Sequence, residues 1–294
     1  MKDYLLFMDV SGDVEERYII EKGIKLLPME FAIDDRIETY TADGQGMDLV
    51  KFYDEIKKRK VVKTSQITPN GYEEYFRPYL KQGYSCLYLG ISKGLSSAYQ
   101  SSLVAKTNLK KEFPNVDLIS VDTDLVTAPL GLLAERMVEN KEKGMLIEEN
   151  ADDLNEIKKK VKGFCFVDDL QALKRGGRIS ATTAFFGSMF NIKPIISIYD
   201  GTLNMIDKQK GIKNSLSKLS QLFKDNYNPE ISNSVYIVDA CEKENADTLE
   251  KLIKEIAPDC NIKRKFLTPI VGAHLGSGAL VVAIFLVVKI WATL

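Results

Sequence analysis

Histidine is almost absent from this chain, and cysteine is scarce. His274 is the one histidine among 294 residues, and the four cysteines lie far apart without a C-x-x-C pair. Zinc sites and redox dithiols need clusters of these residues, so we expect no metal, and no other motif calls for a cofactor. Scattered cysteines are also typical of reduced proteins, which predicts a cytoplasmic location.

A surplus of charge is missing as well. The chain has 40 basic and 41 acidic residues, which leaves a net charge of −1. Proteins that bind nucleic acids or anionic membranes present large positive fields, and this balance does not provide one. We therefore expect no nucleic-acid partner, and we expect any bound anion to be held by local groups.

Hydrophobic runs long enough to cross a membrane are also lacking. The C-terminal run "ALVVAIFLVV" has about half of the roughly 20 residues that a spanning helix needs. The N-terminal "YLLFM" is too short for the core of a signal peptide. We expect a protein without a transmembrane segment.

The spacing of short β-rich runs differs between the two halves of the chain. In the first half, "YLLFMDV", "VVKTSQ", "SCLYLGIS" and "VDLISVDT" alternate with amphipathic segments, which predicts parallel strands with crossover helices. After residue 163, five such runs are separated by only two or three helical segments. We predict a two-domain α/β protein, with a parallel-sheet α/β domain at 1–163 and a mixed α+β domain at 164–294.

Hydroxyl side chains follow two of the predicted strands. "KTSQITPNG" places Thr64 and Ser65 at the carboxyl end of a strand, where open α/β sheets bind ligands. Helix capping explains Thr68 but neither of these two residues, so a site and a plain cap both stay open. "GISKGLSSAYQ" places Ser96 and Ser97 at a helix start, where hydroxyls and free N–H groups suit an anion.

A cationic glycine loop precedes an apolar helical stretch in "LKRGGRISATTAFFGSMFNIKPI". Arg178 follows Gly176 and Gly177 in this loop. The apolar stretch, which more often would be ordinary core, contains Phe185, Phe186, Met189 and Phe190. The adjacency of the two features favours an amphipathic ligand.

His274 lies in the glycine-rich segment "GAHLGSG", where a structural role and a hydrogen bond to a carboxylate both fit. A stand-alone hydrolase using Ser96 or Ser65 with His274 is an alternative, although no G-x-S-x-G elbow is present. Asp9 in "FMDVSGDV" suggests an aspartyl phosphatase, but Ser11 occupies the place of the second acid that this chemistry needs. A capped polar turn is the favoured reading of that segment.

Taken together and in order, these segments resemble the DegV family of bacterial fatty-acid-binding proteins. The segments that carry the resemblance are "TSQITP", "GISKGLSSAYQS", "VDTDLVTAPLG", "FVDDLQALKRGGRIS", "GSMFNIKPIISIYDG" and "VGAHLGSGAL". The resemblance implies a non-catalytic carrier for one long-chain fatty acid, with its tail in the second domain and its carboxylate at the cleft between domains. It also implies a separate ATP-using kinase that converts the carboxylate to an acyl phosphate.

The resemblance further assigns roles to single residues. Thr64, Ser96 and His274 match the family's carboxylate contacts, and Arg178 matches an arginine linked to phosphoryl transfer or partner docking. The chain departs from the family pattern at several positions. Ser97 and Ala98 stand where Gly-Thr is usual, and the loop "DKQKG" offers Lys210 where arginine is common.

Overall fold

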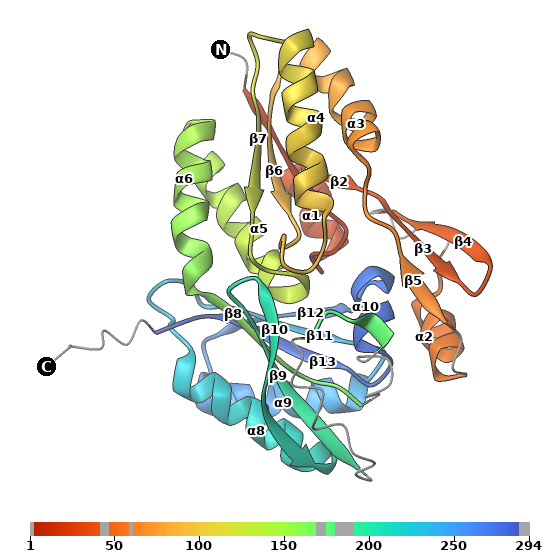
Figure 1. The fold of residues 1–294 in the computed structure, drawn as a ribbon. Helices are drawn as coiled ribbons and strands as arrows, with labels where there is room; N and C mark the ends of the chain where they lie inside the picture. Colours follow the sequence, from red (N-terminus) through yellow and green to blue (C-terminus); the bar gives the residue numbers. More distant parts are fainter. Residues whose placement is uncertain (1–2, 42–46, 59–60, 169–174, 180–190, 288–294) are drawn as a thin grey trace, which may run out of the picture.

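The computed structural model describes residues 3–41, 47–58, 61–168, 175–179 and 191–287. Within these ranges the chain forms a parallel-sheet lobe, a mixed-sheet lobe and a small third sheet beside them (Figure 1). This arrangement confirms the predicted α/β class with one parallel and one mixed sheet. The predicted division into domains at residue 163 stays a prediction.

The parallel-sheet lobe is built on four strands in the order β2-β1-β6-β7. Its elements are β1 (Tyr4–Asp9), α1 (Glu16–Lys22), β2 (Lys25–Leu27), α3 (Pro69–Lys81), β6 (Ser85–Gly90), α4 (Ala98–Glu112), β7 (Leu118–Asp122), α5 (Thr127–Glu142) and α6 (Ile147–Ile157). Phe7 and Tyr88 pack beneath α3 and α4, whereas Leu6 and Leu87 face the opposite side. Both faces are covered, which is why the strands are nearly continuous apolar runs.

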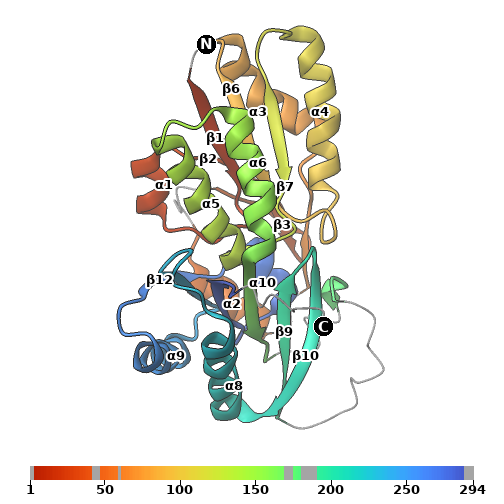
Figure 2. The ribbon, with the colours of Figure 1, turned by 90° about the vertical axis from the view of Figure 1, so that its left-hand side faces the viewer.

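The mixed-sheet lobe holds six strands in the order β10-β9-β8-β13-β11-β12, antiparallel except for the pair β11 and β12. Its elements are η1 (Lys158–Lys160), β8 (Val161–Phe166), β9 (Ile192–Tyr199), β10 (Thr202–Lys210), α8 (Gly211–Asn226), β11 (Ser234–Asp239), α9 (Lys243–Ile256), β12 (Asn261–Phe266) and β13 (Leu280–Phe285). Helices α8 and α9 cover its outer face (Figure 2). Phe166 and Phe223 are buried between them and the sheet.

Helix α5 lies between the two lobes and packs on both sheets. It is buried on nearly all sides, as expected for a helix without a solvent face. Gly163 of β8 permits the close approach, because a Cβ there would lie 2.6 Å from Cγ of Pro129. The lobes therefore share one continuous apolar core.

A small antiparallel sheet corrects one prediction about the first half. It contains β3 (Met29–Ile33), β4 (Arg36–Tyr40) and β5 (Val62–Thr64), and it packs with α2 (Leu49–Lys57) against α10 (Pro269–Leu275). The run "VVKTSQ" was predicted as a strand of the parallel sheet. Instead, β5 pairs antiparallel with β3, with Thr64 opposite Phe31.

Two of the motif residues lie in regular secondary structure. Lys210 ends strand β10, which pairs with β9 along its length, so "DKQKG" is not a free loop. Leu203 near the start of β10 is buried, whereas Asp207 is half-buried and binds Lys218 of α8 at 2.8 Å. His274 lies in the last turn of helix α10, which ends at Gly276 with a φ of 79°.

Candidate ligand-binding site

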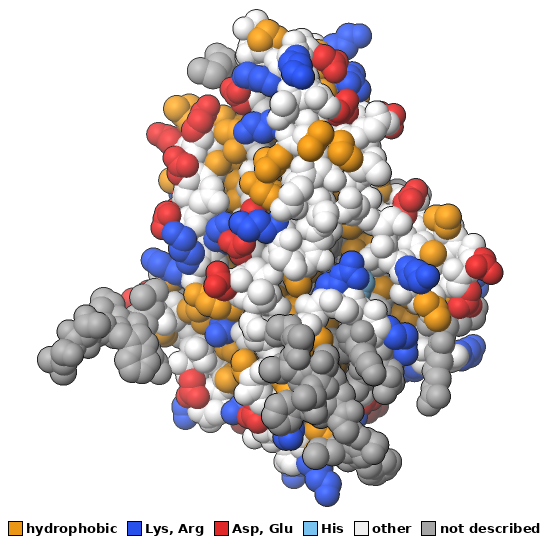
Figure 3. All heavy atoms as spheres, in the orientation of Figure 1, with side chains coloured by type: hydrophobic (Ala, Val, Ile, Leu, Met, Phe, Trp, Pro, Cys, Tyr) orange, Lys and Arg blue, Asp and Glu red, His pale blue; other side chains and the backbone are white. Residues whose placement is uncertain are grey.

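A cavity of about 390 Å³ lies where the two lobes and the small sheet meet. Its polar lining residues are Thr64, Ser65, Gln66, Lys93, Ser96, Ser97, Arg178 and His274. Its apolar lining residues are Met29, Ile91, Leu95, Val126, Ile198, Leu203, Ile270, Val271 and Leu275. Figure 3 shows basic side chains at the surface near the junction of the lobes. The cavity therefore joins a polar end to an apolar wall.

The serine loop, residues 92–97, brings Ser96 to the cavity from the end of β6. Its backbone turns because the amides of Leu95 and Ser96 both donate to the carbonyl of Ser92, at 3.0 and 3.1 Å. Ser96 Oγ accepts from the amide of Ala98 at 3.2 Å, as a residue at a helix start does. Ser97 is the N-cap of α4 and is exposed at the rim.

His274 and Thr64 reach the cavity from two elements that are far apart in sequence. Thr64 Oγ1 and His274 Nε2 lie 2.9 Å apart in a hydrogen bond. Helix α10 approaches α2 closely at Gly272, where a Cβ would lie 2.3 Å from Tyr53 Oη. Tyr53 Oη donates to the carbonyl of Leu267 at 2.8 Å, which fixes the start of α10.

The cationic glycine loop closes over the histidine. Gly176 is buried against the imidazole, and a Cβ there would lie 3.0 Å from Nδ1 of His274. Arg178 Nη1 donates to the carbonyl of Gly176 at 2.8 Å, and its Nε donates to the carbonyl of Leu95 at 3.4 Å. The loop thus connects the histidine to the serine loop.

Burial, together with the nearby positive charge of Arg178, lowers the pKa of His274 to about 4, against a smaller opposing effect of the Gly176 backbone. The imidazole is therefore neutral at pH 7. A neutral imidazole and two hydroxyls provide hydrogen bonds without net charge, so any positive charge at this end of the cavity comes from Arg178 and Lys93.

With this geometry established, comparison with known proteins identifies the family. The model of the DegV proteins, which are described as uncharacterised, matches residues 5–287. This chain belongs to the DegV family. A DegV domain-containing protein of Clostridium perfringens is 35% identical over 286 residues, covering 96% of this chain and 97% of that protein.

Solved structures share the fold over nearly the whole chain. A fatty acid binding DegV family protein from Streptococcus agalactiae is 25% identical, with a TM-score of 0.82, and the match covers 97% of this chain and 99% of that one. A stearic acid-binding protein from Eubacterium ventriosum is 21% identical, with a TM-score of 0.85, covering 96% and 98%. Fatty-acid binding is thus found within the DegV family.

The structure brings the predicted DegV head-group residues together around one cavity. Thr64, Ser65, Ser96, Ser97 and His274 all line it, and Arg178 lines it too. The predicted tail-contacting residues Phe185, Phe186, Met189 and Phe190 lie outside the described residues. The contribution of Lys93 to the lining was not predicted, although this residue stands inside the motif "GISKGLSSAYQS".

Most of the apolar wall was also missed from sequence. Ile198 and Leu203 flank the turn between β9 and β10, and Ile270 and Val271 precede the histidine on α10. Each is an ordinary strand or helix residue in the sequence. The one feature of the sequence that pointed to an apolar wall was the presence of apolar residues between the hydroxyl and glycine residues of the DegV motifs.

Ser96 and Asp9, which two of the alternative enzymatic readings need, make other contacts. His274 Nε2 bonds Thr64, and within the described ranges its Nδ1 makes no hydrogen bond of good geometry. The imidazole therefore makes no hydrogen bond that would activate Ser96 as a nucleophile. Asp9 is fully buried, and its carboxylate accepts from the amides of Ser11 and Ile91, each at 2.9 Å. This is the capped turn favoured from the sequence.

Asp13 anchors the helix that carries His274. Its fully buried carboxylate accepts from the amide of Thr268, the N-cap of α10, at 2.8 Å, and it also binds the hydroxyl of Thr127. Burial raises the pKa of Asp13 to about 6, against the opposing effects of these hydrogen bonds and of Lys265. Its ionised form is therefore less favourable in the folded state than in the unfolded chain.

Asp13→Asn is expected to stabilise the protein relative to wild type more at pH 7 than at pH 4.5. A folded pKa above the unfolded value makes wild-type stability fall as pH rises from about 4 to 6, and the neutral amide removes this loss. Urea unfolding of both proteins at the two pH values measures the difference. A difference that does not change with pH would contradict the expectation.

Two further findings concern the described part of this DegV protein. Among the described residues, no helix is long and apolar enough to cross a membrane. The same part of the chain contains no group of His, Cys, Asp or Glu arranged to hold a metal ion.

Proposed function

We propose that this chain binds one long-chain fatty acid, with its tail against the apolar wall and its carboxylate near Thr64, Ser96 and His274. The observation that carries the proposal is the single cavity that joins these polar groups to apolar residues from both lobes. Its volume of about 390 Å³ falls in the range of small-molecule sites. Fatty-acid binding by a 25% identical DegV protein supports the same assignment.

The energetics favour recognition through the tail. Each buried methylene contributes about 0.8 kcal/mol, so a chain of about 16 carbons supplies roughly 12 kcal/mol before ordering costs. The polar groups then need only orient the carboxylate. Neutral donors hold it less tightly than a bidentate arginine would, which suits a group that must later react.

We further propose that the bound acid is presented to a separate ATP-dependent kinase, which forms the acyl phosphate. The polar end of the cavity lies beside exposed residues, among them Ser97 and Arg178, so a partner could reach the carboxylate there. A cytoplasmic location is part of this proposal, and the four cysteines are free thiols.

Mass spectrometry of gently purified protein tests the ligand. We expect about one fatty acid per chain, and we expect delipidated protein to rebind a long-chain acid. Failure of the delipidated protein to bind any acid in a panel of chain lengths would refute the proposal.

Arg178→Ala tests the presentation to a kinase. We expect fatty-acid affinity close to that of wild type, because the tail dominates binding, together with much slower acyl-phosphate formation when a kinase subunit and ATP are added. The measurements are a binding titration and a phosphorylation assay on the same protein. Unchanged phosphorylation would contradict the role of Arg178.

A further inference from the structure

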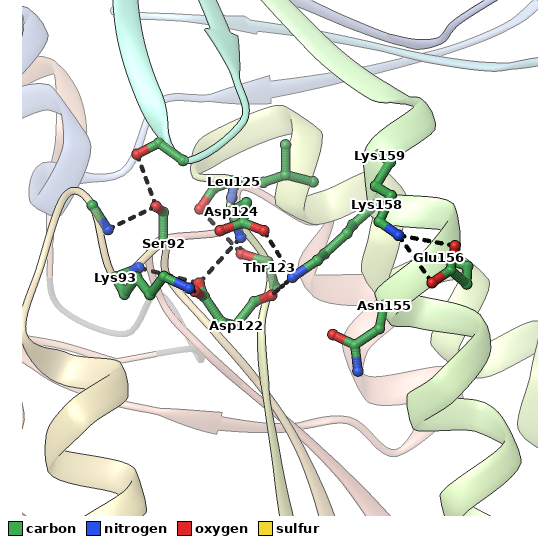
Figure 4. Close-up of polar contacts among 12 residues, drawn as sticks. Ser92, Lys93, Asp122, Thr123, Asp124, Leu125, Asn155, Glu156, Lys158 and Lys159 are labelled. Atoms are coloured by element: carbon green, nitrogen blue, oxygen red, sulfur yellow. Dashed lines mark hydrogen bonds and ion pairs between the residues drawn. The ribbon is translucent and has the colours of Figure 1, made fainter. Parts of the chain in front are cut away.

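Lys158 lies where the chain passes from the parallel-sheet lobe to the mixed-sheet lobe (Figure 4). Its Nζ donates to the carbonyl of Asp122 at 2.5 Å and pairs with Oδ2 of Asp124 at 2.7 Å. Only 12% of its side chain is exposed. Because its ammonium group is largely removed from water, Lys158 depends on these two partners. It therefore restrains the segment that carries them.

That segment, residues 122–126, is called the acidic loop here, and it contacts both walls of the cavity. Asp122 Oδ1 accepts from the amide of Lys93 at 3.1 Å, and the carbonyl of Leu125 accepts from the amide of Ser92 at 2.9 Å. On its other side, the carbonyl of Asp124 accepts from the amide of Gly201 at 2.9 Å. The acidic loop thus connects the serine loop to the turn between β9 and β10.

The serine loop and this turn also contact each other directly. Ser92 Oγ donates to the carbonyl of Gly201 at 3.0 Å and accepts from the amide of Gly94 at 3.1 Å. The approach requires glycine, because a Cβ on Gly94 would lie 2.3 Å from the carbonyl oxygen of Gly201. The turn joins Ile198 to Leu203, both in the apolar wall.

We propose that Lys158 is a positioning residue for the ligand. By fixing the acidic loop, it holds Ser96 of the serine loop at a constant position relative to the apolar wall formed by Ile198 and Leu203. This inference rests on the proposed fatty-acid binding. Lys158 does not line the cavity itself. Its proposed role is to align the polar end of the cavity with the wall that binds the tail.

A double-mutant cycle between Lys158 and Ser96 tests the proposal. Lys158→Met is expected to weaken palmitate binding by about threefold to tenfold, because Ser96 is then no longer held in place relative to the apolar wall. Ser96→Ala is expected to weaken binding by a similar factor in the wild type but by less than about twofold in the Lys158→Met background. Equal factors for Ser96→Ala in both backgrounds would overturn the positioning role.

Lys141→Met provides a matched control. Lys141 Nζ likewise donates to a backbone carbonyl, that of Tyr4, at 2.6 Å, and pairs with Asp3 at 3.1 Å. These contacts lie at the opposite end of β1 from the cavity. We expect palmitate affinity equal to that of wild type, and an equal loss of affinity in Lys141→Met and Lys158→Met would also overturn the proposal.

Hydrogen exchange without ligand separates this proposal from the proposed function. In Lys158→Met, the amides of Lys93, Gly94 and Ser96 are expected to exchange faster than in wild type, whether or not the protein binds fatty acid. If wild type binds no fatty acid, the proposed function fails. The exchange experiment still shows whether Lys158 holds the serine loop in place. Asp124→Asn, which removes the ion pair with Lys158, replaces Lys158→Met if that variant does not fold, and unchanged exchange there would refute the positioning role.

Discussion

Lys263→Met is expected to destabilise the protein by about 3 kcal/mol, because it leaves a buried carboxylate without its cation. Glu135 of α5 is buried and accepts a hydrogen bond from Tyr236 Oη at 2.5 Å. Lys263 of β12 pairs with the same oxygen, and its Nζ lies 5.1 Å from the ring centroid of Tyr18. This cluster joins the helix between the lobes to the mixed sheet.

Urea unfolding at pH 7 measures the effect. The double variant Lys263→Met/Glu135→Gln is expected to recover most of the loss, because it removes the unpaired charge while keeping an acceptor for Tyr236. Lys243→Met is the matched control, since its pair with Asp247 is exposed and contributes less than about 1 kcal/mol. A double variant as unstable as the single one would show that packing, not charge, explains the loss.

Local chemistry made several parts of the fold predictable from sequence. Thr68 and Pro69 begin α3 as the N-cap and first helical residue, because their side chains fix the helix start whatever surrounds it. Ser96 acts in a similar way at α4, since its Oγ accepts from the amide of Ala98, whereas the side chain of the N-cap Ser97 makes no such bond. Strands β1, β6 and β7 followed from apolar runs long enough for a sheet covered on both faces.

The errors arose where distant contacts decide the structure. Strand β5 has three residues, and its pairing with β3 depends on a partner about thirty residues earlier, which its own pattern does not specify. Only Leu203 and Met205 give β10 an apolar inward signal, because the later inward positions are polar, with Asp207 paired to Lys218. Local periodicity reports the burial of apolar residues, and this signal is weak in both segments.

The site shows the same division. Thr64, Ser96 and His274 were proposed from motifs, but the bond between Thr64 and His274 joins residues 210 positions apart. Only the packing of α10 on the small sheet brings them together. The role of Gly176 was equally hidden, because a glycine in a cationic loop gives no sign of the imidazole that lies against it.

Val271→Phe is expected to weaken fatty-acid binding by about 50-fold. Val271 lines the cavity on the face of α10 that also carries His274, and it is 6% exposed. A phenyl ring there takes space that about three methylenes of the ligand would fill, and their loss at about 0.8 kcal/mol each corresponds to this factor. The measurement is a stearate titration of delipidated protein, with thermal unfolding to verify the fold.

His274→Ala gives the decisive contrast. It removes one neutral hydrogen-bonding group, so its expected effect is at most about tenfold. Val104→Phe, on the exposed face of α4, is the control for an added ring and is expected to bind as wild type does. If His274→Ala weakened binding more than Val271→Phe, the polar end would provide most of the affinity. We expect Val271→Phe to bind more weakly than His274→Ala. This order requires the tail to provide most of the affinity, while the neutral groups hold the carboxylate in place.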